Sequence, residues 1–186
     1  MNQIYFLLRK LILPIEDIEK AIPKKGTIVD LGCGQGLIAT YLAQTKTRDL
    51  IGIDNNLLRL PKAKQKNLKF KNGDLTKLDL PKIDGAVISD VLHHLAPNDQ
   101  KELMTKVFTN LKTEGVFVIK EIDSEETIRS MLSRIWDFVL YPKDKISYNS
   151  AKDLKHFLKS TGFKNIKNTR PCRLFPGSTT LFVCTK

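Results

Sequence analysis

The chain reads Val29-Asp30-Leu31-Gly32-Cys33-Gly34-Gln35-Gly36 where a β-branched apolar run, Thr27–Leu31, meets a helical pattern, Leu37–Gln44. Glycines at such a junction let the backbone turn sharply and approach a ligand, because no Cβ intervenes. The helix that follows offers unpaired N–H groups and a partial positive charge at its start. The dinucleotide fingerprint G-x-G-x-x-G would need its last glycine at Leu37. The segment therefore predicts a ligand-binding loop that differs from an NAD site.

Outward from this loop, short apolar runs alternate with helical patterns, as is typical of α/β domains with a parallel sheet. The further strands predicted are Leu50–Ile53, Leu68–Lys71, Gly85–Ser89, Val116–Lys120, Phe163–Asn168 and Thr179–Cys184, the last two forming an edge hairpin through a turn at Pro176-Gly177. The further helices predicted are Asp54–Lys66, kinked near Pro61, one from Pro97 to Gly115, one from Ser124 through Leu140, and Ser150–Ser160, stopped by Gly162. We expect a three-layer α/β/α sandwich with a seven-stranded, mostly parallel sheet whose last strand is antiparallel.

The length of 186 residues suits a single domain. We expect residues 1–22 to form a helical cap and residues 124–160 to form a helical cover within that domain. Three cysteines without a C-x-x-C pair argue against a disulfide scaffold or zinc ribbon and favour a reducing cytoplasm. No apolar stretch is long enough to span a membrane, and the apolar segment Ile4–Ile15 lacks a signal-peptide cleavage site.

The net charge of +11 raises nucleic acid or an anionic lipid surface as a partner. The densest basic run, Asn55–Lys71, carries six basic residues and no acid. The basic residues of the chain are 24 lysines and 7 arginines, and specific base reading favours the arginine fork. We therefore interpret this run as a solvated helix face in preference to a nucleic-acid patch.

Taken in order, the motifs resemble those of the class I S-adenosylmethionine-dependent methyltransferases, which have a Rossmann-like fold. The glycine loop is similar to their first motif, D-x-G-x-G-x-G, and Ile51–Asp54 to the second, whose acid accepts bonds from the ribose hydroxyls. Asn72–Leu75 resembles the third motif, at the adenine, and Ala86–Leu95 the fourth. The resemblance implies S-adenosylmethionine as cofactor, no metal, and cofactor contacts from Asp30, Gly32, Cys33, Gly34, Gly36, Asp54, Asn55, Asp74, Leu75 and Asp90.

Several of these residues also have a purely structural interpretation. The glycines could simply make a turn, and Asp54 stands at a strand-to-helix junction where an acid can cap the helix. Asp74 follows Asn72-Gly73 and could be a turn residue. Cys33 is better explained as a small packing residue than as a nucleophile.

The resemblance implies methyl transfer that releases S-adenosylhomocysteine, but it leaves the acceptor open. Amino methyltransferases of nucleic acids often carry N/D-P-P-Y/F in the fourth motif, where this chain reads Asp90-Val91-Leu92-His93. A small or lipid-like acceptor is therefore our first hypothesis, with peripheral membrane contact through Ile4–Ile15. An RNA methyltransferase is the second, suggested by the charge. A catalytically silent S-adenosylmethionine-binding protein is the third.

His93 and His94 are the candidate catalytic residues, because they follow the fourth strand where an acceptor would lie. A neutral imidazole can take a proton from a hydroxyl acceptor near neutral pH. Related methyltransferases share no universal base, and histidine is commoner at the position matching His94. The alternative is that one histidine packs under the following helix and the other lines the pocket.

Overall fold

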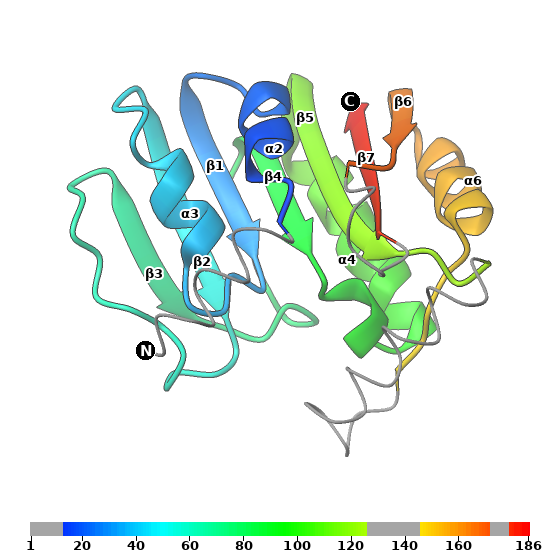
Figure 1. Ribbon diagram of the computed structural model, residues 1–186, viewed down its shortest axis with the longest axis horizontal. Coiled ribbons are helices and arrows are strands. Elements are labelled where there is room, and N and C mark those ends of the chain that lie inside the picture. Colours follow the sequence, from blue (N-terminus) through cyan, green and yellow to red (C-terminus); the bar gives the residue numbers. More distant parts are fainter. Residues whose placement is uncertain (1–12, 126–145, 172–178) are drawn as a thin grey trace.

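The computed structural model describes residues 13–125, 146–171 and 179–186, which build one seven-stranded sheet in the order β3-β2-β1-β4-β5-β7-β6 (Figure 1). The chain crosses over after β3, so that β1 and β4 are neighbours at the centre of the sheet. The strands are β1 (Gly26–Leu31), β2 (Arg48–Asp54), β3 (Leu68–Asn72), β4 (Ile83–Ser89), β5 (Leu111–Ile122), β6 (Lys164–Thr169) and β7 (Thr179–Thr185).

The strand pairing confirms the predicted mixed sheet. The first five strands pair in parallel, whereas β7 pairs antiparallel with both β5 and β6. The last strand is thus antiparallel as expected, and the hairpin lies at one edge of the sheet with β6 outermost. Because parallel strands end at the same side, the ends of β1, β2 and β4 converge on one edge of the sheet, at the bottom of Figure 1.

Helices cover both faces of the sheet and complete the three layers. On one face, α2 (Ile15–Ala21) and α3 (Leu37–Leu42) pack on a core that contains Val87 and Val118. On the other face, α4 (Pro97–Asn110) and α6 (Ala151–Thr161) pack on a core that contains Ala86 and Ile119. Neighbouring residues of β4 and β5 therefore serve opposite cores, which explains why these strands read as continuous apolar runs.

The predicted ends of α6 are confirmed by their caps. The Ser150 hydroxyl accepts a hydrogen bond from the Asp153 N–H at 3.0 Å, which satisfies a free donor of the first turn. At the other end, Gly162 adopts a φ of 111°, a left-handed conformation that a side chain would oppose. Its N–H donates to the Lys159 carbonyl. The predicted start of α4 at Pro97 is also confirmed, since proline fits the first helical position.

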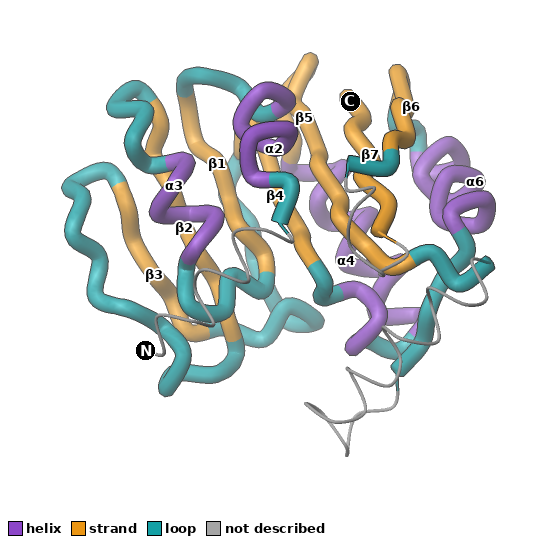
Figure 2. The backbone as a smooth tube through the Cα atoms, in the orientation of Figure 1, coloured by secondary structure: helices purple, strands orange, loops and turns teal. Residues whose placement is uncertain are grey.

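The helix predicted over Asp54–Lys66 is wrong, because Asp54 is the last residue of β2 and residues 55–66 form no helix (Figure 2). The Asp54 carboxylate accepts the N–H of Asn56, and the Asn56 side chain accepts the N–H of Leu58. These bonds offer the backbone an alternative to a helical turn. Pro61 adds a second obstacle, because it disfavours the helical conformation of the residue before it.

The prediction that Gly115 ends a helix is also wrong. Helix α4 stops at Asn110, and Leu111 already has the extended conformation of β5. Within β5, Glu114 has a positive φ of 62°, and the register with β4 shifts between Ile83 and Gly85. A Cβ on Gly115 would lie 2.8 Å from both a Leu111 methyl group and the Lys112 carbonyl oxygen. The glycine therefore permits a tight irregularity inside the strand.

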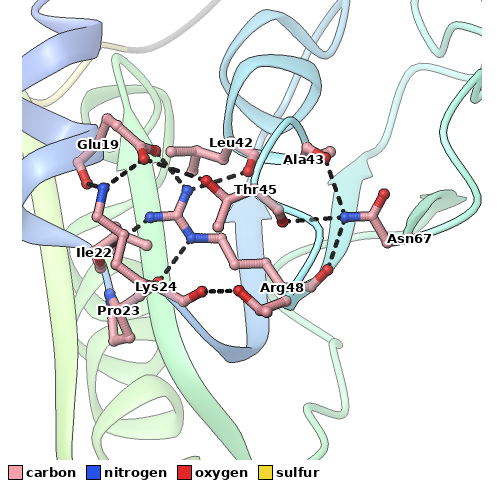
Figure 3. Close-up of polar contacts among 10 residues, drawn as sticks. Glu19, Ile22, Pro23, Lys24, Leu42, Ala43, Thr45, Arg48 and Asn67 are labelled. Atoms are coloured by element: carbon pink, nitrogen blue, oxygen red, sulfur yellow. Dashed lines mark hydrogen bonds and ion pairs between the residues drawn. The ribbon is translucent and has the colours of Figure 1, made fainter.

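A fully buried arginine, Arg48, ties α2 to α3 and β2 (Figure 3). Its guanidinium pairs with the Glu19 carboxylate and donates to the carbonyls of Ile22, Pro23 and Leu42, the Pro23 bond being 2.7 Å long. Burial acts to raise the pKa of Glu19, but hydrogen bonds from Arg48 and Lys24 outweigh it and hold that pKa below its usual value. One side chain thus joins three elements on this face of the sheet.

Several sequence predictions lie outside the described residues. These are the helical cap over residues 1–12 with its membrane contact, the helix from Ser124 through Leu140 beyond residue 125, and the turn at Pro176-Gly177. Among the helices that are described, none has the length and apolar character needed to cross a membrane.

Candidate functional site

The glycine loop lies at the end of β1 and is fastened to the end of β2. The N–H groups of Gly32 and Cys33 both donate to the Ile53 carbonyl, at 2.8 and 2.9 Å. The φ angles of Gly32, Gly34 and Gly36 are 71°, 52° and 70°, values at which any side chain would be strained. The three predicted glycines therefore make the turn that leads from β1 into α3.

The surroundings of the three glycines differ. A Cβ on Gly32 would lie 2.4 Å from the Val91 side chain, and one on Gly36 would lie 2.4 Å from the Phe70 ring. A Cβ on Gly34 would meet no described atom within 4 Å. Gly32 and Gly36 thus let other parts of the protein approach, whereas the backbone at Gly34 faces open space that a ligand can occupy.

Asp30 is buried beneath this loop, 2% exposed, and its carboxylate accepts the N–H of Ala39 at 3.1 Å. Desolvation raises the pKa of Asp30 to about 7, against the hydrogen bond from Ala39 and with a contribution from the nearby negative charge of Asp54. Asp30 therefore holds α3 to the end of β1, and this contact stabilises the glycine loop that connects them.

Stability is expected to depend on pH through Asp30. A raised pKa means that the folded protein binds the proton more tightly than the unfolded chain, so the carboxyl group's contribution to stability falls as the pH rises from about 4 to about 7. Asp30→Asn keeps an oxygen acceptor for Ala39 and removes the titration. We expect the free energy of unfolding of the variant, relative to the unaltered protein, to increase between pH 5 and pH 8.

Urea denaturation at both pH values measures this difference. Asp49→Asn, an exposed acid on β2, is the matched control and should show no such change. Equal effects of Asp30→Asn at pH 5 and pH 8 would contradict the raised pKa.

Asp54 ends β2 and faces the glycine loop. One carboxylate oxygen accepts the Gly34 N–H at 2.8 Å, and the other accepts the Asn56 N–H at 2.8 Å. The side chain thus links the loop to the turn after β2, as a turn-capping acid does, although no helix follows it. Each carboxylate oxygen still has acceptor capacity beyond these bonds. Asn55 is exposed beside it.

Asp74 and Leu75 follow β3 and have different environments. Asp74 is exposed, and its carboxylate accepts the N–H and hydroxyl of Thr76 at 3.0 and 2.8 Å. The backbone hydrogen bond and the hydroxyl bond from Thr76 lower the pKa of Asp74. Leu75 is buried in the core on the α4 face. The turn interpretation of Asp74 thus describes its present contacts, and its exposed position leaves it open to a ligand.

Asp90 stands just beyond β4, with a positive φ of 55° that is unusual for a residue other than glycine. Its carboxylate pairs with the Lys120 ammonium at 2.6 Å, and its N–H donates to the Lys120 carbonyl at 2.9 Å. Lys120 is 3% exposed and comes from β5, the neighbouring strand. The two bonds hold Asp90 in a strained conformation at the edge of the sheet, as is common at functional sites.

His93 lies within a short 3₁₀ turn, η1 (Leu92–His94), and is 2% exposed. Its Nδ1 is 2.6 Å from the Glu121 carboxylate, which also accepts the N–H groups of Val91 and Leu92 at 3.0 and 2.7 Å. The His93 ring is 4.3 Å from that of His94 and stacks on that of Tyr148 at 5.3 Å, both measured between ring centres. Glu121 therefore fixes both the turn and the imidazole.

Sequence reasoning missed the partners on β5 and beyond, namely Lys120, Glu121 and Tyr148. Lys120 and Glu121 are charged residues at the end of an apolar strand, and both are buried. A charged pair in that position was the signal that could have identified them. Tyr148 carried no such signal, because its approach to His93 depends on tertiary structure. The Ser89 hydroxyl is a further missed group, buried at the end of β4 without a hydrogen-bond partner among the described residues.

Cys33 is half-buried in the glycine loop, and a Cβ on Gly52 would lie 3.0 Å from its sulfur. Desolvation, together with the negative charges of Asp30 and Asp54, raises the pKa of its thiol well above the usual range. A thiol held in its neutral form is a poor nucleophile. The packing interpretation of Cys33 is consistent with this environment.

The residues at this edge fit S-adenosylmethionine. The backbone at Gly34 opens onto free space, and the Asp54 carboxylate lies directly beside it. Two carboxylate oxygens match two adjacent ribose hydroxyls, and an open glycine backbone suits close approach of a ligand. Among the predicted cofactor residues, Asp30 and Leu75 lie beneath this edge as supports, whereas Gly34, Asp54 and Asn55 border it.

Curated relatives resemble most of the chain. It is 26% identical over 177 residues to the carboxy-S-adenosyl-L-methionine synthase of Campylobacter hominis, covering 82% of this chain and 75% of that protein. It is 26% identical over 187 residues to the protein of the same name from Nautilia profundicola, covering 87% and 80%.

Solved structures share the fold. A possible histamine N-methyltransferase from Thermotoga maritima has a TM-score of 0.76 at 17% identity, covering 99% of this chain and 94% of that one. Human N-acetylserotonin methyltransferase has a TM-score of 0.73 at 16% identity, covering 94% of this chain and 52% of that one.

The family model described as a methyltransferase domain matches residues 4–168. This match includes the glycine loop, Asp54, the end of β4 and the end of β5. Because it spans most of the chain, the protein belongs to the class I S-adenosylmethionine-dependent methyltransferases.

Proposed function

We propose that this enzyme transfers the methyl group of S-adenosylmethionine to a small or lipid-like acceptor. The environment of His93 is the observation that carries the proposal. His93 stands where amino methyltransferases of nucleic acids place an aromatic ring that stacks on the target base. Here the side chain is 2% exposed, bonded to Glu121, and in contact with the rings of His94 and Tyr148. Because Tyr148 stacks on this ring and His94 lies against it, the imidazole has no open face on which a flipped base could stack.

The residues around the glycine loop would hold the cofactor. Gly34 would let the backbone approach it, Asp54 would accept bonds from the ribose hydroxyls, and Asp74 and Leu75 would lie at the adenine. Asp90, held in place by Lys120, would contact the cofactor from the end of β4. When bound, S-adenosylmethionine supplies a methyl group that its sulfonium already activates. The protein then has mainly to align the acceptor, an effect that can be worth about 7–11 kcal/mol.

Replacing Asp54 tests the cofactor site. Asp54→Ala is expected to weaken binding of S-adenosylhomocysteine by about 1.5–3 kcal/mol, the range for hydrogen bonds to a charged group. Isothermal titration measures the change. Asp49→Ala, an exposed acid of the same strand, should bind normally. If a well-folded Asp54→Ala variant also binds normally, then Asp54 serves only to join the loop to the turn.

His93 would act as the general base for a hydroxyl or amine acceptor. A carboxylate at Nδ1 fixes the tautomer whose Nε2 accepts a proton, which is the arrangement that Glu121 provides. His94 contacts the His93 ring and would line the pocket.

The free thiols of Cys33 and Cys184 agree with a protein of the reducing cytoplasm.

A labelling experiment tests the acceptor class. The purified enzyme is incubated with S-adenosylmethionine labelled in the methyl group and with a cell extract, which is afterwards separated into lipids, small molecules and RNA. We expect label in the lipid or small-molecule fraction. Label confined to RNA would overturn the proposal in favour of an RNA methyltransferase. Binding of the cofactor without labelling of any fraction would favour a catalytically silent protein.

The similarity to carboxy-S-adenosyl-L-methionine synthases over more than four fifths of the chain favours a second candidate function. In that case S-adenosylmethionine would exchange one hydrogen for a carboxyl group from a carboxyl-donating co-substrate, which would take up the released proton, and its methyl group would not pass to a separate acceptor. Mass spectrometry of the nucleoside that co-purifies with the enzyme separates the two functions. S-Adenosylmethionine or S-adenosylhomocysteine supports methyl transfer, whereas a form heavier by one carboxyl group supports the second candidate.

A further inference from the structure

Two large apolar side chains stand out on the surface of the described residues. Leu57 is 68% exposed and Leu58 is 96% exposed, and they are adjacent in the chain. Single exposed leucines are common on protein surfaces, but two adjacent exposed leucines in one loop are a candidate contact surface. We call Leu57 and Leu58 the leucine tip.

The loop holds the leucine tip outward through defined hydrogen bonds. The Asn56 side chain accepts the Leu58 N–H at 3.0 Å, and the Leu57 carbonyl accepts the N–H of Leu60 at 3.3 Å. At the far end of the loop, the Asn67 amide donates to the carbonyls of Ala43 and Arg48, as Figure 3 shows. Both ends of the loop are therefore anchored, and the exposure of the leucines is part of the folded structure.

A dense positive charge accompanies the leucine tip. The loop and the edge strand β3 that follows it contain no acidic residue from position 55 to position 71. Within this stretch five lysines are exposed, and no ion pair joins any of them to a described residue: Lys62, Lys64, Lys66, Lys69 and Lys71. Lysine is a well-hydrated charge suited to diffuse attraction, and an anionic surface would lie against it without needing bidentate geometry.

The leucine tip is also close to the site. Leu57 comes three residues after Asp54, and the loop leaves the end of β2 at the edge where the glycine loop lies (Figure 1). A surface that contacts the leucines would therefore lie near the end of the sheet that carries the glycine loop. This placement suits an enzyme that works next to such a surface.

We propose that the leucine tip and its five lysines dock the enzyme on an anionic lipid membrane, with the leucines entering the interface. Apolar side chains flanked by lysines bind such surfaces through both apolar burial and charge. Nucleic acid fits the observations less well. The exposed part of the loop has no aromatic ring to stack on bases, and binding to nucleic acid would leave the exposed leucines without a role. The proposal does not depend on the acceptor, which can be a small molecule or a lipid.

Vesicle co-sedimentation of the full chain tests the proposal. We expect binding to vesicles of phosphatidylcholine and phosphatidylserine, with little binding to phosphatidylcholine alone and weaker binding at high salt. The double variant Leu57→Ser/Leu58→Ser is expected to reduce partitioning by about tenfold or more, because two apolar side chains are lost from the interface. Lys62→Glu/Lys64→Glu should reduce it by at least about tenfold through charge.

The matched control is Lys152→Glu/Lys155→Glu, which makes the same charge change at exposed positions of α6. It should retain most of the binding. The proposal is overturned if the full chain does not bind anionic vesicles, or if it binds them equally well with the leucine tip removed. The second result would assign binding to another segment, such as residues 4–15. Methyl transfer is measured separately, by labelling of the lipid, small-molecule and RNA fractions of a cell extract, so neither vesicle result decides the proposed function.

Discussion

The variant His93→Asn is expected to lose turnover by about 10² or more, while its affinity for S-adenosylhomocysteine stays within about twofold. His93 follows β4 and is held by Glu121, and neither residue takes part in the bond that joins Gly34 to Asp54. Loss of a base therefore affects the proton transfer and leaves the cofactor contacts in place. Turnover is measured with the acceptor that the labelling experiment identifies, and cofactor affinity by isothermal titration.

Replacing Glu121 distinguishes a role of His93 as a base from a role in packing alone. Glu121→Gln keeps an oxygen for the N–H groups of Val91 and Leu92 but removes the negative partner of the imidazole. We expect lower turnover, and the rising limb of the pH–rate profile should move to lower pH because the imidazolium loses that partner. A role in packing alone would not move the profile.

Two further variants complete this test. His156→Asn, on the exposed side of α6, should retain normal turnover. His94→Asn tests the second histidine and is expected to have a smaller effect than His93→Asn. If both single variants and the double variant at positions 93 and 94 keep near-normal turnover, alignment alone carries the reaction and the base hypothesis is wrong.

The second large effect is expected on stability. Arg48→Met should reduce the free energy of unfolding by about 3–5 kcal/mol, because three carbonyl groups would lose their donor at a cost of about 1–3 kcal/mol each. Methionine keeps much of the side-chain volume, so the loss reports the polar contacts. The carbonyls of Ile22, Pro23 and Leu42 would lose their donor, and Glu19 would lose its buried cation. Thermal unfolding should begin at clearly lower temperature.

The matched control is Lys46→Met, an exposed cation two residues earlier, which should change stability little. Because Arg48 lies on the α2 and α3 face, the folded variant should still bind S-adenosylhomocysteine at low temperature. An Arg48→Met variant with unchanged stability would show that water replaces the guanidinium at these carbonyls.

The sequence predicted most of the sheet because the strands buried on both faces read as continuous apolar runs. Leu50–Ile53 and Gly85–Ser89 fall within β2 and β4, and Ser150 and Gly162 cap α6. The helix over Asp54–Lys66 was wrong because side-chain bonds from Asp54 and Asn56, together with Pro61, oppose a helix that the composition alone allows. The helix predicted to end at Gly115 was wrong because a glycine suits an irregular strand as well as the end of a helix.

The family and its cofactor followed from the sequence by itself. The glycine loop and the acids at positions 54 and 74 are short-range patterns, because each is made by residues close together in the chain. The spacing of the three glycines after Asp30 and the acid that closes the apolar run Ile51–Ile53 can each be read from a few neighbouring residues. Local chemistry of this kind can be recognised before the fold is known.

Only the tertiary structure decided which of these residues support the site and which border it. Asp30 is a buried support whose pKa is raised to about 7, and His93 is fixed by an acid 28 residues further along the chain. The exposure of Leu57 and Leu58 could likewise not be predicted, because these residues lie in a loop where the sequence predicted a helix. Burial and long-range pairing depend on which strands become neighbours, and that is settled by the packing of the whole sheet.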